Sequence, residues 1–148
     1  MIGPKSRSTN LRSNTTVQRA FLIALTTLVL LLLLSACART QPVLNITDEP
    51  VVTGSGETPS ASAVRDAIIE ACRAKKWLVD PSQDGLVIAT AKVRQHTAVV
   101  DIRYTPESYS ISYRDSEVLL YDGNMIHRNY NKWVQLLSER VNLEINKL

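Results

Sequence analysis

The feature that most limits what this chain can fold into is an apolar run close to its amino end. Residues 20–34 read AFLIALTTLVLLLLL, and the nineteen residues before them carry four basic side chains and no acidic one. The run ends in Leu34-Ser35-Ala36-Cys37. A basic stretch, an apolar stretch and small residues before a cut position are typical of a secretory signal peptide. We therefore expect residues 1–36 to be removed and to contribute nothing to the folded domain.

The residues at the cut position resemble the lipobox of bacterial lipoproteins, which is a leucine, two small residues and a cysteine. The resemblance implies that Cys37 takes a diacylglycerol on its sulfur, that the chain is then cut between Ala36 and Cys37, and that lipid holds the protein in a membrane. Ala38 stands where an aspartate would resemble an inner-membrane retention signal, so the implied address is the outer membrane, facing the periplasm. The alternative is an uncleaved anchor, but residues 20–36 are only 17 in number, at the low end for a helix that spans a bilayer.

A cut at this position changes what the charge of the chain implies. The whole sequence has 17 Lys and Arg against 14 Asp and Glu, and the 112 residues from Cys37 onward keep 13 of the former and all 14 of the latter. A nearly neutral chain of this length predicts one small domain and gives no reason to expect a nucleic-acid partner. Cys72 is left without a cysteine to pair with, and we expect it to be a buried core thiol.

Residues 37–59 are expected to be the lipidated cysteine followed by a flexible tether. From Ala38 onward they hold three prolines and two glycines and show no helical pattern, which is typical of a linker. The alternative is a short edge strand at Val43-Leu44 or Val51-Val52. The globular domain is then expected over residues 60–148.

Hydrophobic periodicity predicts the secondary structure of that domain. The expected elements are a helix over 60–76, strands over 86–93, 96–104 and 109–114, and a helix over 129–146 capped by Asn129. A turn is expected over 80–85 from its composition. The order α-β-β-β-α predicts an α+β fold of two layers, a three-stranded antiparallel meander with both helices packed on its one apolar face. Trp77 and Trp133 are expected to be buried between the helices and the sheet.

Five segments of this domain carry a resemblance to known proteins. They are 76–79 (KWLV), 85–90 (GLVIAT), 94–100 (RQHTAVV), 109–113 (YSISY) and 126–133 (IHRNYNKW). Together with the lipobox, they are similar to a family of small uncharacterised proteobacterial lipoproteins, over about residues 60–148. The resemblance implies an envelope location and a lipid anchor, and it implies no activity.

The densest group of polar and aromatic residues lies between positions 121 and 133. The candidate binding surface in it consists of Tyr121, Asp122, His127, Tyr130 and Asn131. Three of these, His127, Tyr130 and Asn131, are spaced i, i+3, i+4, so on a helix that begins early enough they share a face, and an alternative function is then a small-ligand or metal-binding module. The favoured interpretation is structural: His127 and Asn131 hydrogen-bond backbone at a tight corner, next to an Asp122-Gly123 turn.

Motifs that carry chemistry are missing from the sequence. It has two histidines and no HxxxH, HxH or CxxC spacing, no glycine-rich phosphate loop and no GxSxG elbow, so we predict no metal site, no cofactor and no catalytic residue. A cryptic hydrolase built from Asp115, Ser116 and His127 is a further alternative. The leading prediction is a non-catalytic, membrane-anchored envelope lipoprotein that binds or supports another envelope component, with an unidentified envelope protein as its partner.

Overall fold

The computed structural model describes residues 18–25 and 39–148. The chain divides into two compact units, Met1–Ala38 and Arg39–Leu148. In the first unit, residues 18–25 are helical. Within the described residues, no helix is long and apolar enough to cross a membrane. The predicted cut between Ala36 and Cys37 lies outside the described residues and stays a prediction.

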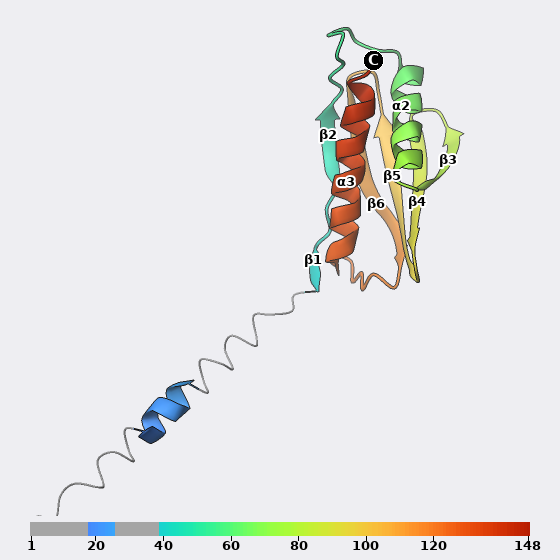
Figure 1. Ribbon diagram of the computed structural model, residues 1–148. Coiled ribbons are helices and arrows are strands. Elements are labelled where there is room, and N and C mark those ends of the chain that lie inside the picture. The colour runs from blue at the N-terminus through green and yellow to red at the C-terminus, as the bar shows by residue number, and fades with distance from the viewer. Residues whose placement is uncertain (1–17, 26–38) are drawn as a thin grey trace, which may run out of the picture. The chain divides into compact units, whose positions relative to one another are not determined.

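The second unit combines two sheets with two helices (Figure 1). Its elements in chain order are β1 Thr40–Pro42, β2 Ile46–Pro50, α2 Ala61–Ala74, β3 Leu78–Gln83, β4 Leu86–Val93, β5 His96–Tyr104, β6 Ser108–Glu117, β7 Met125–His127 and α3 Arg128–Ile145. Five strands form an antiparallel sheet in the order β2-β6-β5-β4-β3, and β1 pairs with β7 in a separate two-stranded sheet. The predicted α+β class is confirmed.

The main sheet has five strands, whereas the sequence predicted three. The three predicted strands are β4, β5 and β6, which short turns join into antiparallel neighbours with Val93 opposite His96 and Tyr104 opposite Tyr109. β3 was expected to be mostly turn, because its composition is that of a loop. It occupies an edge of the sheet, where an interrupted ladder is tolerated, and its pairing with β4 is irregular between Asp80 and Gln83.

The prediction of a tether over residues 37–59 is wrong for its described part. β2 pairs with β6, with Pro50 opposite Ser108, and the apolar side chains of this stretch pack against the core. They are Val43, Leu44, Ile46 and Val51. Even the irregular stretch after β2 is held in place, since the Gly54 N–H donates to the Asn146 carbonyl at 3.0 Å. A Cβ at Gly54 would meet that oxygen at 2.5 Å, which explains the glycine. The folded domain therefore begins at Arg39.

One core lies between the helices and the sheet, and both helices contribute their apolar stripes to it. The buried residues of α2 are Val64, Ala67, Ile68, Ala71 and Cys72, and the buried apolar residues of α3 are Tyr130, Val134, Leu137, Val141 and Ile145. In the sheet, directly opposed pairs such as Ala89–Val100 and Ile102–Ile111 are buried with them. Figure 1 shows α2 and α3 side by side in front of the sheet. Trp77 is buried as expected, but Trp133 is only half-buried.

Candidate functional site

His127 caps helix α3, which begins one residue earlier than predicted. It is the last residue of β7, and its Nδ1 accepts the N–H of Asn129 at 3.2 Å. A capping side chain satisfies one of the free N–H groups in the first turn of a helix. Asn129, the predicted cap, is instead the second residue of the helix. The imidazole is therefore engaged in local backbone structure, as in the second of the two sequence interpretations.

Asn131 joins α3 to the connection between β1 and β2. Its Oδ1 accepts the Leu44 N–H at 3.0 Å, and its Nδ2 donates to the Pro42 carbonyl at 2.9 Å. One amide group thus satisfies a donor and an acceptor of a segment almost ninety residues away in the chain. This geometry replaces the two backbone bonds that a paired strand would have made. Asn131 holds the first strands in place, which the sequence could not show.

Tyr121 and Asp122 form a turn. Asp122 Oδ1 accepts the N–H groups of Met125 at 2.7 Å and Asn124 at 3.0 Å, and these bonds hold the pKa of the Asp122 carboxyl below its ordinary value. The Tyr121 hydroxyl donates to the Gly123 carbonyl at 3.1 Å, and Gly123 has a φ of 103°, which a glycine adopts readily. This corner is predicted correctly as an Asp-Gly turn.

Tyr130 points into the core rather than onto a shared surface with His127 and Asn131. Its side chain is 0% exposed, and it meets the Tyr113 ring edge-on at 5.6 Å. Its hydroxyl has no hydrogen-bond partner within residues 18–25 and 39–148. Burial raises the pKa of this phenol. The residues of the predicted binding surface therefore have separate structural roles. His127 caps a helix, Tyr121 and Asp122 form a turn, Asn131 hydrogen-bonds the backbone of the β1–β2 connection, and Tyr130 is part of the core.

The hydrolase interpretation and the metal-site interpretation also find little support in the geometry, since the hydrolase residues already have hydrogen-bond partners. The Ser116 hydroxyl lies 3.0 Å from the Tyr113 hydroxyl, and Asp115 Oδ1 accepts the Ser116 N–H at 2.7 Å. In the described part of the chain, no group of three or more His, Cys, Asp or Glu residues is placed to hold a metal ion.

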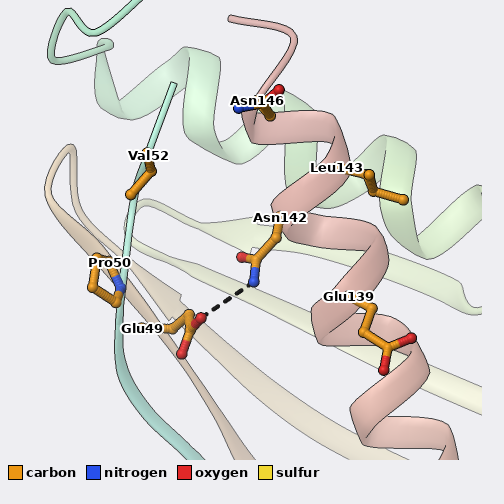
Figure 2. Close-up of a pocket in the computed structure, with 7 residues that line it drawn as sticks. All are labelled: Glu49, Pro50, Val52, Glu139, Asn142, Leu143 and Asn146. Atoms are coloured by element: carbon orange, nitrogen blue, oxygen red, sulfur yellow. Dashed lines mark hydrogen bonds between the residues drawn. The ribbon is translucent and has the colours of Figure 1, made fainter. Parts of the chain in front are cut away.

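A groove that the sequence did not predict lies between β2 and α3, with a cavity volume of about 630 Å³. Its walls are Glu49, Pro50 and Val52 on one side and Glu139, Asn142, Leu143 and Asn146 on the other (Figure 2). Two apolar residues in it are largely uncovered, with Val52 65% and Leu143 60% exposed. It combines apolar contact area with two carboxylates, at Glu49 and Glu139.

A hydrogen-bonded chain behind the groove orients Glu49. The buried Tyr109 hydroxyl donates to Asn142 Oδ1 at 2.8 Å and lies 2.8 Å from Ser138 Oγ. Asn142 Nδ2 in turn donates to Glu49 Oε1 at 3.2 Å, the contact drawn in Figure 2. Burial raises the pKa of Tyr109 to about 12, so the hydroxyl stays protonated and keeps its donor. The sequence gives no signal for this chain, because Glu49 and Asn142 are 93 positions apart.

No known family model, curated protein or solved structure matches the chain. The similarity to proteobacterial lipoproteins therefore depends on the residues quoted above and stays a prediction.

Removing the hydroxyl from each of the two buried tyrosines, Tyr109 and Tyr130, is expected to change the free energy of unfolding in opposite directions. Tyr109→Phe is expected to lower the free energy of unfolding by about 1–2 kcal/mol, because Ser138 and Asn142 lose a buried partner. Tyr130→Phe is expected to raise it by up to about 1 kcal/mol, because the hydroxyl that it removes is buried without a partner. Urea unfolding followed by circular dichroism measures both. Equal destabilisation by the two substitutions would contradict the assignment of partners.

Proposed function

We propose that this protein is a bacterial envelope lipoprotein, lipidated on Cys37, whose domain binds another envelope protein without catalysing a reaction. The proposed location is the outer membrane, on the side of the periplasm. The observation that carries the binding role is the groove between β2 and α3. It is an open apolar surface with two carboxylates, one of which, Glu49, is held by a hydrogen bond from Asn142.

The position of the groove beside a sheet edge favours an extended peptide as the bound segment. β2 is the outermost strand of the five-stranded sheet, paired on one side with β6. Edge strands accept an added strand through their free backbone groups. Apolar side chains of such a peptide would pack on Val52 and Leu143, and a lysine or arginine would pair with Glu49 or Glu139. The proposed partner therefore presents an extended apolar segment that carries basic residues.

The start of the folded unit supports the lipid anchor. The unit begins at Arg39, two residues after the cysteine of the lipobox. A cut before Cys37 would therefore remove no residue of β1 or of the core, and it would leave the domain directly behind the lipid. The coincidence is expected of a processed precursor, in which the signal and the domain are separate units.

The other two interpretations have less support. A ligand or metal site at His127, Tyr130 and Asn131 would use side chains that already cap a helix, fill the core or clamp a backbone segment. A hydrolase would need Ser116, whose hydroxyl is bonded to Tyr113. We therefore propose neither.

A photo-crosslinking amino acid at position 143, in the full chain expressed in the producing bacterium, tests the binding role. We expect an adduct with one envelope protein, formed through an extended segment with basic residues. The matched control carries the crosslinker at Leu78, which at 66% is about as exposed as Leu143 at 60% but lies on the opposite edge strand.

The charge arm of the same experiment uses Glu49→Gln together with Glu139→Gln. Loss of both carboxylates is expected to reduce the adduct at position 143 severalfold, because the basic residue of the partner loses its counter-charge. An adduct that forms equally from position 78, or that ignores the double substitution, would count against the groove as the binding surface.

A further inference from the structure

The charges of the folded unit are unevenly distributed, although their sum is close to zero. Arg39 opens the unit, and its carbonyl accepts the Arg128 N–H at 2.9 Å. Thr40 pairs with His127, and the ring centroids of His127 and His96 lie 6.0 Å apart. His96 is the first residue after the turn that contains Arg94, so that turn lies at the same end of the domain. Figure 1 shows β1 at the end where α3 begins and the carboxyl terminus at the other end. Three arginines therefore gather at the end of the domain where β1 begins.

A shallow pocket brings lysines and tryptophans together between α2, β4 and α3. Its cavity volume is about 190 Å³, and it is lined by Lys75, Lys76, Trp77, Ala91, Lys92, Val93, Trp133 and Leu136. α2 ends at Ala74, so the last residues of β4 are left partly uncovered, with Val93 45% exposed. Lys132, which precedes Trp133 in the sequence, lines a second hollow together with Arg128. The surface is both basic and apolar.

We define the basic end of the domain by seven exposed residues. They are Arg39, Lys75, Lys76, Lys92, Arg94, Arg128 and Lys132. Within residues 18–25 and 39–148, the basic residues that form ion pairs with carboxylates are Arg65, Arg114, Arg140 and Lys147. None of the seven residues of the basic end is among them.

Acidic groups near the basic end are few and already hydrogen-bonded. Asp115 accepts the Ser116 N–H, Glu117 accepts the Thr97 hydroxyl at 2.9 Å, and Asp122 accepts two turn N–H groups. The rest of the unit has the remaining eleven acidic side chains and six basic side chains. The basic end thus has an excess of four positive charges, and the rest of the domain has an excess of five negative charges.

We infer that the basic end lies on the anionic phospholipid headgroups of the membrane that holds Cys37. The inference rests on the proposed lipid anchor and adds to it the orientation of the domain. Two residues of extended chain span at most about 7 Å, so a lipid on Cys37 keeps Arg39 within about one Debye length of the headgroups. Each lysine or arginine at an anionic surface strengthens binding about fivefold. Trp133, Val93 and Leu136 supply the amphipathic and apolar groups that favour a membrane interface.

This orientation directs the groove away from the bilayer. The groove contains Asn146, two positions before the last residue, Leu148, and Figure 1 places the carboxyl terminus at the end opposite β1. The acidic part of the domain would then face the periplasm, where a partner can reach Glu49 and Glu139. Repulsion between those carboxylates and the lipid phosphates favours the same orientation.

Lysine acetylation of the processed, lipid-bearing chain tests the inference. The chain is reconstituted in vesicles of phosphatidylcholine, with or without phosphatidylglycerol, and modification is measured by mass spectrometry. In the anionic vesicles we expect Lys75, Lys76, Lys92 and Lys132 to react at least about fivefold more slowly, and high salt to remove this protection. Lys147, near the other end, is expected to react equally in both. Equal rates at all five lysines would overturn the inference.

A matched pair of triple variants separates this surface from total charge. Lys75→Gln, Lys76→Gln and Lys92→Gln together are expected to abolish the protection of Lys132. Arg65→Gln, Arg103→Gln and Arg114→Gln remove the same charge elsewhere and are expected to keep it; the opposite pattern would overturn the proposed surface. The mass of the amino-terminal peptide reports the anchor itself. A chain without lipid on Cys37 overturns the anchor and this inference with it, whereas a lipid-bearing chain without protected lysines overturns the orientation alone.

Discussion

Replacing Cys37 with serine is expected to reduce labelling of the protein by palmitate to background and to leave residues 1–36 on the chain. The reason is chemical, since a hydroxyl does not replace the thiolate as the nucleophile that takes the diacylglycerol, and the resemblance to a lipobox implies that the cut follows lipid transfer. Several acyl chains hold a protein in a bilayer essentially permanently, at about 0.8 kcal/mol per buried CH₂. Growth with labelled palmitate and the mass of the purified chain measure the outcome.

Cys72→Ser is the matched control for this experiment. Cys72 is 0% exposed on α2, and burial raises the pKa of its thiol to about 12, so it is neither accessible nor ionised. We expect this variant to be cut and labelled like the parent chain. A Cys37→Ser chain that still takes up palmitate, or a Cys72→Ser chain that does not, would refute lipidation at Cys37.

Trp77→Ala is expected to lower the free energy of unfolding by about 3–5 kcal/mol, the range for removal of a large buried aromatic side chain. Trp77 is 5% exposed and joins the residues that follow α2 to the core. A loss of this size is a large fraction of the stability of a small domain. Urea unfolding followed by far-ultraviolet circular dichroism measures it without depending on tryptophan emission.

Trp133→Ala is the comparison that makes this prediction specific. The sequence predicted the same burial for both tryptophans, but Trp133 is half-buried at the pocket of the basic end. We expect its replacement to cost about 1–2 kcal/mol, since less apolar area returns to water. If the two substitutions destabilised the domain equally, the difference in burial would be wrong.

The sequence predicted the elements whose signal is local. The apolar stripe of the helix predicted over 60–76 repeats at the i, i+3, i+4, i+7, i+8 spacing of a helix with one buried face, and α2 buries these five residues, namely Val64, Ala67, Ile68, Ala71 and Cys72. The alternation in β5 and β6 and the short turns between β4, β5 and β6 likewise predicted three antiparallel neighbours. Helix α3 was misplaced at its start by one residue, because its capping group is the histidine at the end of β7 rather than Asn129.

The strands that the sequence missed depend on partners far along the chain. β1 has three residues and β2 has five, too few to show a period. Glycine and proline nearby made the stretch resemble a linker. What makes β2 a strand is the edge of β6, more than fifty positions later, and the amide of Asn131 that holds the connection before it.

At positions 121–131, too, the sequence predicted the local structure but not the contacts with distant residues. Composition identified the segment as unusual and predicted the Asp122-Gly123 turn. It could not decide between a binding surface and a structural corner, because that depends on what lies opposite each polar atom. In the structure, the Leu44 N–H and the Pro42 carbonyl lie opposite Asn131, and the core surrounds Tyr130.

By itself, the sequence determined the α+β class, the central strands, the two helices and their buried faces, because these follow from periodicity within a few neighbouring residues. It also carries the lipobox pattern from which the anchor at Cys37 is proposed. Tertiary structure alone decided where the domain begins, which strands complete the sheet, and that the groove and the basic end exist. Those features arise where residues distant in the chain meet, and their chemistry is set by three-dimensional neighbours that no local pattern specifies.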